Sequence, residues 1–178
     1  NTIMDNQMII SFLELALALV LGVMSLFITH YILVRIYRSK FPAPDENPYK
    51  NTAFMVFLSG VMLSVGYLLT GIIEPLSSTL DLLLAGPREA SIVWEYTKFL
   101  ALFAGLGFVL GAVINVLAFM LFSALTTQVK ELDEIKNGNI GVAVLVSVIA
   151  ITIAIFCKEP FLVLLESFIP YPEVPRLF

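Results

Sequence analysis

The sequence predicts an all-α, polytopic membrane protein with four transmembrane helices in two tandem two-helix repeats, plus short interfacial helices. Three observations predict this class: 59% of the 178 residues are hydrophobic, only 13% are charged, and four uncharged runs are long enough to cross a bilayer. A soluble domain carries about 25% charged residues, and four such runs leave too little polar chain to cover a soluble core.

The four spans follow from the length of the uncharged runs, because a bilayer core about 30 Å thick needs about 20 helical residues. We expect the first span at about 8–36, with Glu14 inside it, and the second at 51–73. The third run is too long for one crossing, so its helix is placed at about 95–121, and the fourth span is expected at 137–157.

Two segments outside the spans are expected to lie on the membrane surface. The segment at 76–86 begins with helix-capping residues, continues with apolar residues and stops at a Gly-Pro pair, which predicts a short interfacial helix. Residues 159–178 carry apolar side chains at helical spacing before three prolines, which predicts an interfacial outer tail; the alternative is an irregular tail packed on a partner subunit. The first repeat is therefore 1–88 and the second is 89–178.

The orientation follows from the distribution of lysine and arginine, which accumulate in short cytoplasmic loops. The loops at 35–50 and 130–136 together hold six of these cations, and the opposite side holds four. We therefore expect both termini outside. A signal peptide would need a basic segment before its apolar run, but Asp5 precedes this one, so the first span is expected to be retained.

Composition and missing motifs exclude several function classes. A net charge of −4 with ten scattered cations argues against nucleic acid as a partner, because phosphate binding needs a basic patch. One cysteine, Cys157, cannot form an intrachain disulfide, and one histidine, His30, cannot alone build a histidine metal site. The chain has no His-Glu-x-x-His, Gly-x-Ser-x-Gly or Gly-x4-Gly-Lys motif. We expect no enzyme activity and no cofactor.

Two loops expected on the cytoplasmic side share a pattern at an offset of 88 residues. The pattern Asp-Glu-x4-Asn-x-(small) opens a span in both copies, which contain Asp45, Glu46 and Asn51, and Asp133, Glu134 and Asn139. An even number of spans separates the copies, so an ancestral duplication would make them parallel. The alternative is helix-cap chemistry alone, because acidic residues and asparagine favour a helix start. The acid pairs could also bind a divalent cation between the repeats, although solvated caps are the simpler interpretation.

The duplicated unit also indicates a family. One copy contains Phe41-Pro42-x-x-Asp45-Glu46 and Asn51-Thr52-Ala53, and the other contains Asp133-Glu134-Ile135-Lys136-Asn137-Gly138-Asn139-Ile140-Gly141. Over about 10–157, this unit resembles the YjfL-like bacterial inner-membrane proteins of unknown function. The resemblance implies a four-span inner-membrane fold of two repeats and no established activity. Gly141 and Val142 depart from the alanine-rich start expected of that family, and the tail after Lys158 has no counterpart there.

Each span carries small residues at a spacing of four on one face, which allows helix backbones to approach closely in lipid. These helix-packing candidates are Ala18 and Gly22, Gly60 and Ser64, Gly107 and Gly111, and Ala143 and Ser147. Gly107 and Gly111 are the most specific signal of a helix contact. Asn115 follows them one turn later, and exposing its amide group to lipid would cost free energy. The alternative is that some of these small residues match the spacing by chance.

Three polar residues within the spans form a candidate intramembrane site. Glu14 lies at spacings of four and eight from Ala18 and Gly22, so it is expected on the packing face; it is interpreted either as a proton or cation site or as a border residue that is hydrated near the outer surface. Asn115 is the second candidate. His30 is the third, and it is interpreted as an interfacial hydrogen-bonding residue more readily than as a ligand.

These features predict a non-enzymatic integral membrane protein that acts by homo-oligomeric assembly or as a subunit of a larger membrane complex. Its expected partners are the lipid bilayer and other membrane subunits. The alternative function is an ion channel or transporter subunit with a polar path near Glu14, Asn115 and His30. A continuous water-accessible path beside Glu14 would distinguish the alternative function from the first.

Overall fold

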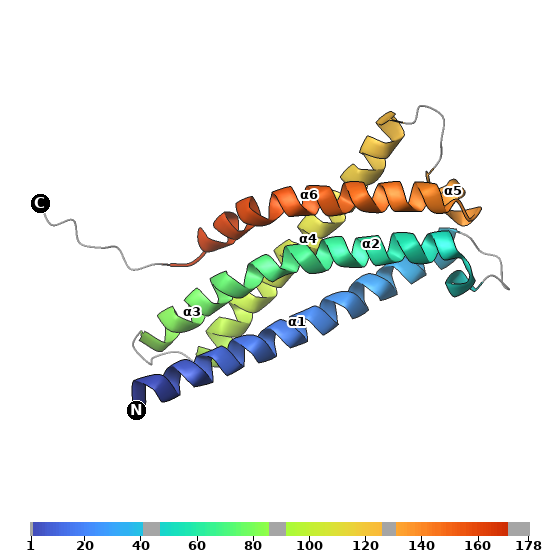
Figure 1. The fold of residues 1–178 in the computed structure, drawn as a ribbon. Helices are drawn as coiled ribbons and strands as arrows, with labels where there is room; N and C mark the ends of the chain where they lie inside the picture. Colours follow the sequence, from blue (N-terminus) through green and yellow to red (C-terminus); the bar gives the residue numbers. More distant parts are fainter. Residues whose placement is uncertain (1, 41–46, 86–91, 126–130, 171–178) are drawn as a thin grey trace, which may run out of the picture.

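The chain folds into a bundle of long helices (Figure 1). The computed structural model describes residues 2–40, 47–85, 92–125 and 131–170, and every regular element in these ranges is helical. The elements in chain order are α1 (Thr2–Lys40), η1 (Pro48–Lys50), α2 (Thr52–Leu69), η2 (Thr70–Ile72), α3 (Ile73–Ala85), α4 (Ile92–Leu125), α5 (Glu131–Lys136) and α6 (Ile140–Glu166).

Four helical stretches of the described chain are long and apolar enough to cross a membrane. They are Glu14–Ser39, Thr52–Leu84, Ile92–Leu125 and Ile140–Glu166. The prediction of an all-helical, membrane-embedded chain with four such helices is confirmed. All four helices extend beyond the ends of the predicted spans, because a helix that leaves the hydrocarbon keeps its internal hydrogen bonds and ends only where a local signal stops it.

The parallel helices α2 and α6 form the centre of the bundle. α2 packs against α6 more extensively than any other pair of elements does, and both helices run in the same direction (Figure 1). α4 packs against both central helices, whereas α1 packs mainly along α2. Of the four apolar stretches the second is the most buried, at 56%, and the first is the least buried, at 17%; together with the packing of α1 along α2, this places α1 at the periphery.

The two ends of the bundle differ in the elements that they contain (Figure 1). We call them the α5 end, where η1, α5 and the first residues of α2 and α6 lie, and the α3 end, where α3 lies beside the beginning of α4. These names carry no orientation relative to a membrane.

Both central helices begin at an asparagine cap. Asn51 Oδ1 accepts a hydrogen bond from the amide of Phe54 at 3.0 Å, and Asn139 Oδ1 accepts one from the amide of Val142 at 3.2 Å. Each cap satisfies a backbone donor that has no partner within the helix. Gly138, with a φ of +85°, precedes the second cap and allows the sharp turn from α5 into α6.

The second helical stretch continues past residue 73, where the sequence predicts the end of a span. A single 3₁₀ turn, η2, joins α2 to α3, and the helix runs on to Ala85. Pro75 does not interrupt it, because in the first turn of α3 its missing N–H costs little. The segment expected as a separate surface helix is thus a continuation of α2, with Leu76 and Thr79 fully buried; residue 86 lies outside the described residues.

The fourth helix likewise continues beyond residue 157. α6 passes through Pro160 and ends at Glu166, so the expected tail begins as regular helix. Phe161 and Leu165 are buried in the bundle, which explains why the helix persists across a proline. Residues 171–178 of the expected outer tail lie outside the described residues.

Candidate functional site

α2 and α6 approach each other closely at Gly60. A Cβ atom added to Gly60 would lie 3.1 Å from the Cα atom of Ser147 and closer still to its hydroxyl group. Ser147 is 6% exposed and donates to the carbonyl oxygen of Ala143 at 2.7 Å, so its own helix satisfies it. Ala143 is fully buried one turn away. Glycine at position 60 is therefore what allows the two backbones to approach.

Two glycines of α4 also lie at close contacts. A Cβ atom on Gly107 would overlap the side chain of Leu69 and would lie 3.1 Å from Cδ1 of Ile72. A Cβ atom on Gly111 would lie 3.1 Å from Cγ2 of Val65. The small-residue face of α4 therefore packs onto the second helical stretch.

A polar contact accompanies this α4 interface in the middle of the bundle. Asn115 Nδ2 donates to the carbonyl oxygen of Gly111 at 2.8 Å and to Ser64 Oγ at 3.3 Å. Ser64 is 1% exposed and donates to the carbonyl oxygen of Val61 at 2.9 Å. Asn115 Oδ1 is buried and has no hydrogen-bond partner among the described residues. If the Oδ1 and Nδ2 atoms of Asn115 exchanged places, the side-chain oxygen would face the carbonyl oxygen of Gly111. The hydrogen bond to Gly111 therefore fixes the orientation of the Asn115 amide.

The small residues of α1 line an open cavity instead of a helix contact. In the described part of the chain, no neighbouring element lies within 4 Å of a Cβ atom added to Gly22 or to Gly66 of α2. Between them is a cavity of about 200 Å³, which we call the α1–α2 groove, lined by Ala18, Leu21, Gly22, Ser25, Leu26, Gly66, Leu69, Thr70 and Ile73. This lining is predominantly apolar.

Glu14 lies at the α3 end, where three helices meet. Its carboxylate accepts a hydrogen bond from the hydroxyl group of Ser77 on α3. Tyr96, near the start of α4, is close enough for an electrostatic interaction with Glu14. Glu14 is half-buried, and neither of these contacts is to a residue of the α1–α2 groove.

His30 lies at the other end of α1, at the α5 end of the bundle. Its Nε2 atom is 3.2 Å from the hydroxyl oxygen of Tyr49, and the two rings are stacked with 5.9 Å between their centroids. Sixteen residues of helix separate His30 from Glu14, which corresponds to about 24 Å. Glu14, Asn115 and His30 therefore have three separate sets of neighbours, and the structure does not bring them into one site.

The residues of the repeat pattern have different partners in the two copies. The side-chain amide of Asn51 donates to the carbonyl oxygens of Ile135 and Lys136, at 3.0 and 2.9 Å, so it fastens the end of α5 to the start of α2. The side-chain amide of Asn139 instead donates to the carboxylate of Glu134 at 2.8 Å. The cap of α2 is therefore the one that joins the two halves of the chain.

The acidic members of the pattern do not form a metal site in the part of the chain that the structure describes. Asp133 is exposed, and no group of three or more His, Cys, Asp or Glu side chains is arranged to hold a metal ion among the described residues. Asp45 and Glu46 lie outside those residues.

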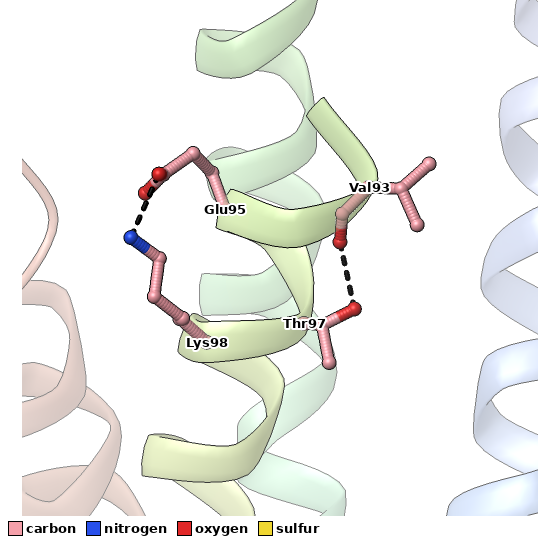
Figure 2. A network of polar contacts seen from close by, with 4 residues as sticks. All are labelled: Val93, Glu95, Thr97 and Lys98. Carbon is pink, nitrogen blue, oxygen red and sulfur yellow. Dashed lines mark hydrogen bonds and ion pairs between the residues drawn. The ribbon is translucent and has the colours of Figure 1, made fainter. Parts of the chain in front are cut away.

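Charged residues near the start of α4 are paired with each other. Lys98 Nζ lies 2.7 Å from Glu95 Oε1, and the neighbouring Thr97 hydroxyl group donates to the carbonyl oxygen of Val93 (Figure 2). Lys98 is half-exposed and lies at the α3 end, away from the repeat pattern.

A second, larger cavity opens at the α5 end. Its volume is about 580 Å³, and it lies between the segment that leads into α2 and the segment that leads into α6. Its lining is half polar and includes Lys50 and Lys136. We call it the basic cavity.

The amino-acid sequence can be compared with those of known families. The profile of a family described as Domain of Unknown Function (DUF350) matches residues 7–159. The chain belongs to the DUF350 family. The DUF350 match begins within α1, covers α2 to α4 and ends in α6, one residue before Pro160. Neither the curated proteins nor the solved structures contain a match to the chain.

The sequence alone revealed neither the partners of Glu14 nor the basic cavity. Ser77 is 63 residues from Glu14, and no spacing pattern links residues on different helices. Lys50 and Lys136 each stand within three residues of a capping asparagine, and this shared proximity is the one signal that pairs them.

Proposed function

We propose that this DUF350 protein is a non-enzymatic integral membrane protein that works by assembly, and that the α1–α2 groove receives a helix from a second copy. One observation carries the proposal: Gly22 and Gly66 face an open apolar groove, whereas Gly60, Gly107 and Gly111 are each covered by a neighbouring helix. In lipid, small residues stabilise helix pairs by allowing close van der Waals contact.

The peripheral position of α1 supports the same proposal. Only 17% of its most apolar window is buried within the chain, so most of its surface is available to a partner. The groove crosses from α1 to α2, which would let an incoming helix contact both. A subunit of a larger membrane complex could supply such a helix as well as a second copy could.

Native mass spectrometry of the gently extracted protein tests this proposal, because it reports copy number and co-purifying subunits together. Gly22→Leu should leave the fold intact, since its side chain enters open space, and should lower the proportion of assembled protein. Gly105→Leu is the matched control, because Gly105 also faces open space but does not line the groove. A wild-type protein that is strictly monomeric, or equal assembly in both variants, would contradict the proposal.

We further propose that the chain consists of two tandem parallel repeats and belongs among the YjfL-like proteins of the bacterial inner membrane, with both termini outside. The parallel course of α2 and α6 and the two asparagine caps support the repeat. The excess of cations in the loops at the α5 end supports the orientation.

A second candidate function is an ion or proton pathway that uses Glu14. The observation that favours it is the half-buried carboxylate of Glu14, which accepts a hydrogen bond from Ser77 between α1 and α3. An ionisable group inside a membrane costs about 2.5–3.5 kcal/mol and commonly marks a functional site.

Glu14→Gln separates this candidate from a structural role, because glutamine keeps an oxygen that can accept from Ser77 and removes the charge. If Glu14 serves a pathway, reconstituted wild-type vesicles should pass protons or cations and the variant should pass fewer, with unchanged assembly. Wild-type vesicles without any flux would refute the pathway and leave Glu14 as a hydrated border residue.

A further inference from the structure

The exposed face of α1 changes its chemistry along the helix. One row of exposed side chains runs along this face at spacings of three and four residues, apolar toward the α3 end and polar toward the α5 end. α1 lies at the edge of the bundle, and its C-terminal end is at the α5 end (Figure 1). We call this row the α1 stripe, and it consists of Val20, Met24, Phe27, Tyr31, Arg35 and Arg38.

The polar end of the α1 stripe holds two arginines without an acidic partner. Arg35 Nη1 donates to the hydroxyl oxygen of Tyr31 at 3.2 Å, which positions the guanidinium group and leaves its other N–H groups and the phenol hydrogen for a ligand. Arg38, one turn later, is exposed, and no carboxylate of the described residues pairs with either guanidinium group. α1 itself has no acidic residue after Glu14.

The two arginines lie at the level where α2 begins. The hydroxyl oxygen of Tyr37, which stands between them in the sequence, is 3.5 Å from Nδ2 of Asn51, the residue that caps α2. Thr52 then opens the second membrane-length stretch. Phe27 lies eight residues before Arg35, which places it about 12 Å farther into the first membrane-length stretch. The α1 stripe therefore has positive charge at the membrane border and apolar side chains beyond it, in the order in which a phospholipid carries its phosphate and its acyl chains.

We propose that the α1 stripe binds an anionic phospholipid, with the phosphate at Tyr31, Arg35 and Arg38 and an acyl chain along the apolar side chains. Guanidinium groups form paired, charge-assisted hydrogen bonds with phosphate oxygens, and the phenol donates a further bond. A headgroup with net negative charge is favoured over a zwitterionic one, because the arginines repel the amine of the latter. The α1 stripe shares no residue with the α1–α2 groove, so lipid binding and assembly through the groove can fail separately.

Native mass spectrometry tests the preference for the headgroup. Each protein is equilibrated in mild detergent with equal amounts of phosphatidylglycerol and phosphatidylcholine, and the retained lipids are counted. The wild type should retain phosphatidylglycerol preferentially, and Arg35→Gln/Arg38→Gln should lower this preference by about tenfold. Both arginines are exposed and glutamine favours helix, so the double variant should fold. Lys98→Gln is the control: it removes a charge that Glu95 already pairs, and it should behave as the wild type.

Tyr31→Phe separates a binding site from a diffuse attraction between charges. The change keeps both arginines and removes only the hydroxyl group, so a diffuse attraction to anionic lipid would not respond to it. A bound phosphate would lose one hydrogen bond and Arg35 would lose its partner, so the preference should fall by about threefold.

Fluorescence quenching tests the place of the acyl chain. Trp94 is the one tryptophan of the chain, so Trp94→Phe combined with Phe27→Trp leaves a single indole in the α1 stripe. In vesicles, phosphatidylglycerol with brominated acyl chains should quench this indole more strongly than phosphatidylcholine with the same chains does. Adding the two arginine changes should remove the difference. Met120→Trp in the Trp94→Phe background is the control, because Met120 is exposed in an uncharged part of α4 and both lipids should quench its indole equally.

Four results would overturn the proposal. They are a wild type without a preference for phosphatidylglycerol, an Arg35→Gln/Arg38→Gln protein that keeps the preference, a Tyr31→Phe protein that matches the wild type, and equal quenching of the Phe27→Trp protein by the two lipids. The last two apply even if the double variant does not fold. An equal loss of preference in Lys98→Gln would likewise show that total charge, and not the α1 stripe, selects the lipid.

Discussion

Gly60 of α2 and Ser147 of α6 lie so close together that no side chain fits between them. The Ser147 hydroxyl group donates to the carbonyl oxygen of Ala143 on its own helix, so it remains hydrogen-bonded at this contact. The central pair of helices is therefore held at this point by close packing of their backbones.

Gly60→Ala should destabilise the protein by about 1–3 kcal/mol, because the added methyl group overlaps Ser147 and the helices must separate. Thermal unfolding in mild detergent measures the change. Gly105→Ala is the control: its methyl group meets nothing, so the better helix propensity of alanine should leave stability unchanged or raised by about 0.5–1 kcal/mol. Equal stability of the two variants would show that α2 and α6 do not approach at Gly60.

Gly111→Leu should lower the unfolding temperature more than Leu110→Ala does. The leucine side chain at position 111 would enter the space that Val65 occupies, whereas Leu110 is only half-buried, so its truncation removes less contact. The comparison uses purified protein in one detergent. Equal tolerance of the two changes would place the small-residue face of α4 against lipid.

Asn51→Ala should cost about 1–2 kcal/mol more stability than Asn139→Ala. Each change removes one helix cap. The first also breaks two partly buried hydrogen bonds to the end of α5, whereas the second breaks one exposed hydrogen bond to the Glu134 carboxylate. Chemical unfolding in detergent with both variants measures the difference. If Asn139→Ala were the more damaging change, the contact between the two halves would contribute nothing to stability.

The proposed orientation predicts different labelling of single cysteines at Ser39 and Ser78. In a background without Cys157, an impermeant thiol reagent added to intact cells should reach position 78 and should reach position 39 only after permeabilisation. Ser39 ends the first membrane-length helix at the α5 end, and Ser78 lies on α3 at the opposite end. Labelling of position 39 alone from outside would reverse the topology.

Properties of a single segment could be predicted from the sequence. The four apolar runs and the asparagines at helix starts depend on residues that are neighbours in the chain, and the structure places the four membrane-length helices over those runs. The ends of the helices were harder to predict, because the length of an uncharged run does not show where a helix stops in water. Packing against distant residues also decides where a helix ends, as the burial of Phe161 and Leu165 near the end of α6 shows.

Properties of pairs of helices could not be predicted in the same way. Gly22 and Gly60 occupy similar small-residue patterns, yet one faces open space and the other faces Ser147. A spacing of four describes one helix, whereas a contact depends on the position of a second. For the same reason the sequence identified Glu14 but not Ser77, whose place beside it depends on the packing of α3 against α1.

The bonds from the Asn51 side chain to α5 end on backbone oxygens, and this limits which changes the protein tolerates there. Any amino acid at position 135 or 136 carries the same carbonyl group, so these bonds place no demand on the side chains at the end of α5. An inserted or deleted residue between α5 and α6 would move both carbonyl groups out of reach. These two bonds should therefore survive substitutions at positions 135 and 136 far more readily than a change in the length of the connection.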